Sequence, residues 1–118
     1  MYKYFRLHEF DSPDEPGSGE LMEANVLEAL DNARDLAGFP FVVTSGVRSI
    51  AHNKAVGGSR SSSHLMGYAV DLAVPNSRRR FIMLESLLDA GFTRIGIGQD
   101  FIHVDMDPNK TQNVIWTY

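Results

Sequence analysis

The sequence predicts an α+β domain in which a small antiparallel sheet is flanked by helices. Its 118 residues suit one compact domain spanning residues 1–118, long enough to bury a core without disulfides. Two long stretches carry apolar residues at helical spacing, and several short β-branched or alternating stretches are typical of strands. Helices and strands do not alternate regularly along the chain, which favours antiparallel returns over a doubly wound parallel sheet.

The first half of the chain predicts a loop, a helix and a short strand. Residues 11–19 are dense in Pro, Gly, Ser and acids, which is typical of a loop. Apolar residues recur at helical spacing over residues 21–37, and Gly38 supplies the stop. Residues 41–44 predict a buried strand that ends at Ser45-Gly46, residues 49–56 one or two helical turns, and residues 57–63 a flexible loop.

The second half predicts a helix between strands. Residues 68–74 are a predicted strand closed by Pro75-Asn76, and a helix follows over residues 77–90, stopped by Gly91. Further strands are predicted at 93–97, 101–106 and 114–118. We interpret the C-terminal aromatic residues Trp116 and Tyr118 as capping the core rather than lining a groove.

Composition narrows the function classes. The net charge of −4 argues against a general nucleic-acid binder and slightly disfavours adhesion to an anionic cell wall. The absence of cysteine means that any bound metal would have nitrogen and oxygen ligands. No apolar run approaches the ~20 residues of a membrane span, and the first residues hold no apolar signal core, so we expect no signal peptide.

Two of the four histidines lie near acids in suggestive settings. His64 ends a Ser/Gly loop, and Asp71 follows inside an apolar strand, where a carboxylate is costly to bury unless a metal, an arginine or backbone donors compensate its charge. His103 and Asp105 are two residues apart on a predicted strand, so they share one face. Taken alone, the first setting also fits a hydrogen-bonded Asp at a sheet edge, and the second also fits the solvent-exposed face of a strand.

Together, the two settings favour a catalytic zinc site. Such a site needs three protein ligands and one open position for water, and His64, Asp71 and His103 provide two imidazoles and one carboxylate. Asp100, three residues before His103, is a candidate base for the water proton. We interpret Asp105 as orienting a neighbouring ligand or substrate; a solvated acid is the alternative. His8 and His52 are not proposed as ligands.

The ordered set of motifs resembles a known family of zinc peptidases. Residues 63–71 carry S-H-x-x-G-x-A-x-D, and residues 103–105 carry H-x-D; upstream, residues 45–48 read S-G-x-R. The set resembles zinc D-Ala-D-Ala carboxypeptidases, vancomycin-resistance D,D-dipeptidases and phage L-alanyl-D-glutamate endolysins. The resemblance covers about residues 39–105, and residues 5–19 also look like short phage-encoded members.

The resemblance implies a role for each matching residue. His64, Asp71 and His103 would hold Zn2+, and Asp100 would be the general base, where many relatives have Glu or His. Arg48 would bind substrate and stabilise the oxyanion, and Ser63 would bind substrate. The implied fold is the α+β fold shared with the signalling domain of hedgehog proteins. The implied function is zinc-dependent hydrolysis of an amide bond in peptidoglycan stem peptides.

The resemblance leaves the bond cleaved open. A carboxypeptidase needs donors for a free terminal carboxylate, and Arg60 is a candidate; an endopeptidase leaves its groove open. The short chain favours a phage-type lysin, cytoplasmic until release or virion-associated, that acts at the cell wall as a monomer on peptidoglycan peptides. The alternatives are a non-catalytic zinc-binding module for wall fragments or a protein partner, and a structural phage or wall-assembly protein with a vestigial site.

Overall fold

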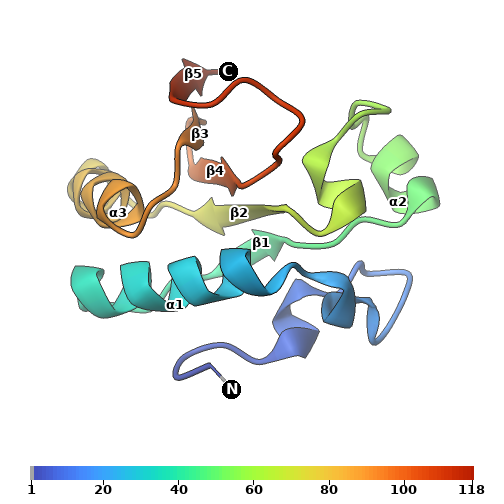
Figure 1. Cartoon of the computed structure of the whole chain (residues 1–118), viewed down its shortest axis with the longest axis horizontal. Helices are drawn as coiled ribbons and strands as arrows, with labels where there is room; N and C mark the ends of the chain where they lie inside the picture. The colour runs from blue at the N-terminus through green and yellow to red at the C-terminus, as the bar shows by residue number, and fades with distance from the viewer. Residues whose placement is uncertain (1) are drawn as a thin grey trace.

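The computed structural model describes residues 2–118 and confirms the predicted α+β class. Five strands form one sheet in the order β1-β2-β4-β3-β5, with helices packed around it (Figure 1). The strands are β1 (Val43–Ser45), β2 (Ala69–Ala73), β3 (Arg94–Ile97), β4 (Phe101–Asp105) and β5 (Val114–Thr117). The α-helices are α1 (Ala24–Ala37), α2 (Ile50–Ala55) and α3 (Ser77–Asp89), and the 3-10 helices are η1 (Leu7–Phe10), η2 (Ser18–Leu21) and η3 (Ser63–Met66).

The two long helices form where the sequence predicts them. α1 ends at Gly38, whose φ of 79° places it in the left-handed region that glycine adopts without steric penalty. α3 begins after Asn76, whose side chain accepts a hydrogen bond from the backbone N–H of Arg79. The two helices pack against each other and bury their apolar faces in the core. In the part of the chain that the structure describes, no helix has the length and apolar character needed to cross a membrane.

The sheet is antiparallel except at one edge. β2 pairs antiparallel with both β1 and β4, and β4 pairs antiparallel with β3. β5 differs from the predicted sheet because it pairs with β3 in parallel. After β4 the chain crosses over β3 to reach the free edge, so β5 arrives running in the same direction as β3 (Figure 1). The sequence of the predicted strand at residues 114–118 does not indicate in which direction the strand pairs.

Alternation along the strands separates a core face from a polar face. Val70 and Leu72 of β2 and Ile102 of β4 are fully buried and belong to the same apolar cluster as the helices. Asp71 and His103 alternate with them, and the two lie opposite each other in the β2–β4 register. The register therefore puts both side chains on the sheet face that points away from the apolar core.

The segment predicted as a loop at residues 11–19 is ordered by its own polar groups. The carboxylate of Asp11 accepts hydrogen bonds from the backbone N–H groups of Gly17 and Gly19, which lower its pKa. Ser12 and Asp14 reach across to Ser49: the hydroxyl of Ser12 accepts from its backbone N–H at 3.1 Å, and Asp14 accepts from its hydroxyl at 2.6 Å. The loop therefore fixes the chain immediately after Arg48.

We expect Leu30→Ala to lower the free energy of unfolding by about 2–5 kcal/mol, because Leu30 is fully buried in the cluster beneath the sheet. Leu36→Ala on the same helix is the matched control, since Leu36 is 59% exposed and its loss should change stability by less than about 0.5 kcal/mol. Urea denaturation followed by circular dichroism measures both. Equal losses for the two variants would contradict the described packing of α1.

Candidate metal centre

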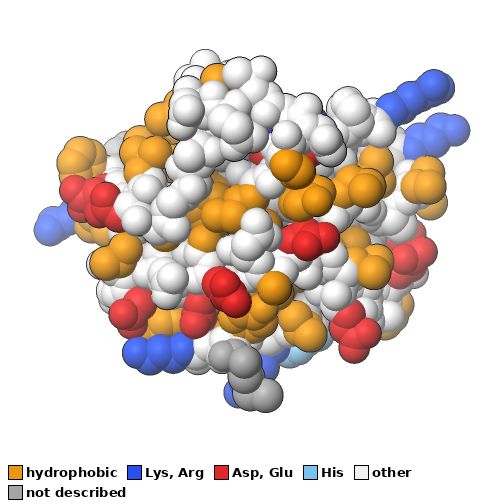
Figure 2. Space-filling view, viewed as in Figure 1, with side chains coloured by type: hydrophobic (Ala, Val, Ile, Leu, Met, Phe, Trp, Pro, Cys, Tyr) orange, Lys and Arg blue, Asp and Glu red, His pale blue; other side chains and the backbone are white. Residues whose placement is uncertain are grey.

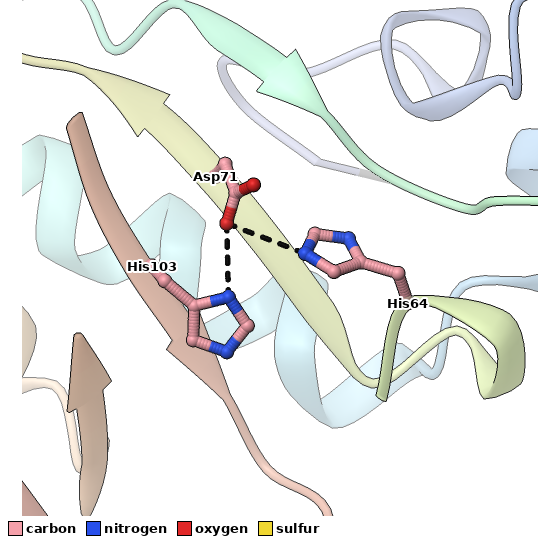
Figure 3. A group of neighbouring side chains, drawn as sticks. All are labelled: His64, Asp71 and His103. Carbon is pink, nitrogen blue, oxygen red and sulfur yellow. Dashed lines mark hydrogen bonds and ion pairs between the residues drawn. The ribbon is translucent and has the colours of Figure 1, made fainter. Parts of the chain in front are cut away.

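Three predicted ligands from separate parts of the chain meet on the polar face of the sheet (Figure 3). His64 comes from η3, Asp71 from β2 and His103 from β4. Oδ1 of Asp71 lies 2.9 Å from Nδ1 of His103 and 3.3 Å from Nε2 of His64. One potential ligand atom from each residue lies within 4.8 Å of the other two.

The backbone around η3 sets the orientation of His64. The Ser62 hydroxyl caps η3 by accepting a hydrogen bond from the N–H of His64. The buried ring then places Nδ1 at 2.8 Å from the carbonyl oxygen of Gly46. Because a carbonyl can only accept, Nδ1 carries the proton and the lone pair is on Nε2, the nitrogen that faces Asp71.

Asp105 sets the orientation of His103. Its Oδ2 accepts a hydrogen bond from Nε2 of His103 at 2.8 Å, while its Oδ1 accepts from Nε of Arg94 at 2.7 Å. Asp105 is only 1% exposed, so this carboxylate is a fixed part of the interior. With the Nε2 proton donated to Asp105, Nδ1 of His103 is the nitrogen left to face Asp71. The structure thus shows the contact expected of an acid that orients a neighbouring ligand.

The carboxylates and imidazoles of the site shift one another's pKa values. Burial opposes the ionisation of Asp71, but when the imidazoles carry a second proton the nitrogens of His103 and His64 that face Asp71 donate hydrogen bonds to it, and these outweigh burial and hold the pKa of this carboxyl well below its usual range. Burial also opposes the charged form of His103, yet hydrogen bonds to Asp105 and Asp71 raise the pKa of its imidazole. For Asp105, the hydrogen bond from His103 is the main effect that overcomes burial and lowers its pKa.

The donor set fits a tetrahedral zinc ion. Zinc bonds of about 2.0–2.2 Å in a tetrahedral arrangement place neighbouring ligand atoms roughly 3.3–3.6 Å apart. Oδ1 of Asp71 lies at such a separation, 3.3 Å, from Nε2 of His64 and at a shorter one, 2.9 Å, from Nδ1 of His103. Two neutral imidazole lone pairs and one carboxylate are also the ligand types of catalytic zinc sites. Both outer imidazole nitrogens have acceptors, Gly46 and Asp105, as metal-binding histidines require.

A cavity of about 390 Å3 opens onto the group and includes both predicted substrate-binding residues, Arg48 and Ser63. The guanidinium of Arg48 lies 3.4 Å from Oδ2 of Asp71, the carboxylate oxygen that does not face the imidazoles. Ser45 and Asn53 also accept hydrogen bonds from Arg48. Ser63 is buried and donates to Asp107 at 2.7 Å.

The structure does not bring Asp100 to this group. Asp100 is an exposed residue of the turn between β3 and β4, and its side chain is not among those lining the cavity. Its backbone carbonyl accepts from Val74, one position beyond the end of β2. The tight turn before Phe101 keeps the side chain at the end of the hairpin, away from the middle of β4. Arg60 is likewise exposed and outside the cavity lining.

The cavity also contains residues to which sequence reasoning gave no role, or the wrong one. Trp116 and Tyr118 line it instead of capping the core, and the Trp116 indole lies 5.5 Å from the His103 ring. A Cβ at Gly96 would lie 2.6 Å from the Trp116 indole, so glycine at this position makes room for the aromatic side chain. Arg94 and Lys110 complete the wall. Arg94 and Trp116 reach the cavity through the cross-strand register and Lys110 through the path of the loop after β4, and the sequence displays neither.

Comparison with known proteins agrees with this geometry. The model of a protein family described as Peptidase M15 matches residues 3–105, which include all three residues of the candidate metal centre. No curated protein matches the sequence.

We expect Asp105→Asn to weaken zinc binding by roughly 10–100-fold, the usual effect of losing an outer hydrogen-bond partner of a ligand. The oxygen of the introduced amide would face Arg94, so its nitrogen would donate to Nε2 of His103 and move the imidazole proton to Nδ1, where zinc should bind. Competition with a fluorescent chelator measures the affinity. Asp89→Asn, an exposed acid on α3, is the control. An unchanged affinity in folded Asp105→Asn protein would contradict the orienting role.

Proposed function

Because this chain belongs to the Peptidase M15 family, we propose that it is a zinc metallopeptidase that hydrolyses an amide bond in peptidoglycan stem peptides. Membership of the family indicates a peptidase. The observation that carries the zinc proposal is the convergence of His64, Asp71 and His103 beside a cavity. The resemblance of the motifs to D-Ala-D-Ala carboxypeptidases and L-alanyl-D-glutamate endolysins supports the peptidoglycan substrate and a phage-type lysin acting at the cell wall.

The side chains around the candidate metal centre would have different roles in amide hydrolysis. Zinc, when bound, supplies Lewis acidity that polarises the scissile carbonyl and activates water. Asp71 and the two imidazoles would hold it, with Gly46 and Asp105 fixing the rings. Arg48 lies on the cavity side of Asp71, where its guanidinium can donate to the oxygen on which negative charge develops. Ser63 forms part of the wall that receives the peptide.

For the proton acceptor we propose Asp100, on the strength of its spacing from His103 and the family motif that this spacing resembles. Among the residues described, the carboxylates that line the cavity are Asp71 and Asp105, and both are engaged with imidazoles and an arginine. Neither is therefore free to accept a proton from water. Because Asp100 is exposed, its substitution should leave the fold intact, and the activity of the variant tests this role directly.

The engagement of both described cavity carboxylates also favours one alternative function. A cavity that contains metal-binding side chains and cationic side chains, but no unengaged carboxylate among the described residues, suits a non-catalytic zinc-binding module that holds wall peptides without cleaving them. The two functions differ in a single readout, because the module would bind stem peptides and release no product.

We expect purified peptidoglycan treated with the zinc-loaded protein to release new peptide fragments, and a chelator to stop their release until zinc is restored. Mass spectrometry of the fragments identifies the bond: loss of single alanine residues marks a carboxypeptidase, and stem peptides that begin with glutamate mark an L-alanyl-D-glutamate endopeptidase. His64→Ala should be inactive, while His52→Ala, whose ring is outside the group, should remain active. Binding without any product would support the non-catalytic module instead.

We expect Asp100→Asn to lower kcat by roughly 100-fold or more while zinc affinity is unchanged, because a general base contributes about 10²–10⁴-fold. Asp89→Asn controls for loss of a surface charge. Cleavage at the wild-type rate by Asp100→Asn would show that Asp100 is only a turn residue, and the proton acceptor would have to be sought elsewhere.

A further inference from the structure

The segment between β4 and β5 contributes a lysine to the cavity wall. Residues 106–113 leave the sheet after β4 and form a loop that returns to β5 (Figure 1). Lys110 lies in this segment and lines the cavity together with His64 and His103. Its Nζ donates to the hydroxyl of Ser63 at 2.9 Å, and that hydroxyl donates to Asp107.

Lys110 is the least committed cation of the cavity. Arg94 is bound to Asp105 at 2.7 Å, and Arg48 donates to three side chains. Lys110, in contrast, lies 3.8 Å from the nearest carboxylate oxygen, on Asp107, and 30% of its side chain is exposed. An ammonium group has three N–H donors, and the Ser63 hydroxyl uses one of them. The remaining donors are available to a ligand in the cavity.

The charges around the cavity favour an anionic ligand. The wall contains three cationic side chains, of Arg48, Arg94 and Lys110, and two carboxylates, of Asp71 and Asp105. With Asp107, which accepts a hydrogen bond from Ser63, the three cations and three carboxylates carry no net charge. A divalent ion at the candidate centre would therefore give the cavity an excess of two positive charges. The chain as a whole carries a net charge of −4, and Figure 2 shows acidic side chains spread over the face it draws. A positive cavity in an acidic protein attracts anions selectively.

We propose that Lys110 binds the α-carboxylate of the substrate residue that follows the scissile bond. This inference rests on the proposed function, and it applies to both candidate substrates of the peptidase. In D-Ala-D-Ala, the residue that supplies the leaving amine has a free terminal carboxylate; in L-Ala-D-Glu, the corresponding residue has a free α-carboxylate. In both substrates the carboxylate is attached to the carbon next to the scissile nitrogen, so one cation beside the metal centre serves either. Ser63 positions the ammonium by accepting one of its hydrogen bonds, and Asp107 holds the Ser63 hydroxyl by accepting from it.

Matched acid and amide peptides test the subsite. One pair ends in D-Ala-D-Ala with a free or an amidated terminus; the other contains L-Ala followed by D-glutamate or by its α-amide, D-isoglutamine. The zinc-loaded wild type should prefer the acid of whichever pair it cleaves by roughly tenfold, mainly through KM, as expected for a charge-assisted hydrogen bond in a partly exposed cavity. Lys110→Met should lose most of this preference, and Lys110→Arg should restore part of it.

Lys54→Met is the control, because Lys54 is an exposed lysine of α2 that does not line the cavity. Thermal unfolding and zinc stoichiometry establish that each variant is folded and loaded. If the wild type cleaves acid and amide equally, or Lys110→Met keeps the preference, the subsite is wrong while the peptidase function stands.

If no peptide is cleaved, the peptidase function fails, and calorimetric binding of the same peptides still decides the subsite. Tighter binding of the acid by the wild type than by Lys110→Met would support the subsite without catalysis. Equal affinities would overturn it.

Discussion

The carboxylate of Asp71 is the constraint on which the site depends. It lies between two fully buried residues of β2, Val70 and Leu72, and its burial is tolerated because Oδ1 faces two imidazoles and Oδ2 faces the Arg48 guanidinium. All of these contacts require the β2–β4 register that places Asp71 opposite His103. A slip of one residue would turn one of these side chains into the apolar core.

A second set of interactions holds the imidazoles in place. Gly46 and Asp105 each occupy the outer nitrogen of one ring, and Arg94 in turn holds Asp105 from the neighbouring strand. The ring nitrogens that face Asp71 are therefore selected by groups outside the candidate centre. Such preorganisation lets a metal bind without the rings having to reorient, which is the property that a catalytic site needs.

The fold assigns different tasks to its rigid and its connecting parts. The sheet and η3 supply the side chains of the candidate centre, whose positions would have to be accurate to hold a metal, while the segments around residues 48 and 110 supply the cations that would meet the peptide. Each connecting segment is tied down by hydrogen bonds, to the 11–19 loop in one case and to Ser63 in the other. Substrate preference can therefore vary with these segments while the centre remains unchanged.

The sequence by itself determined the two long helices, the alternating strands and the three residues of the candidate centre, because periodicity and motif spacing are local properties of the chain. It also indicated Asp105 as a partner of a ligand, since residues two apart on a strand share a face. Only the tertiary structure decided that β5 runs parallel to β3 and that Asp100 lies in an exposed turn. Only it brought Arg94, Lys110 and Trp116 to the cavity. These facts depend on which strands become neighbours and on how a loop crosses the sheet, and contacts between distant segments leave no periodic trace in the sequence.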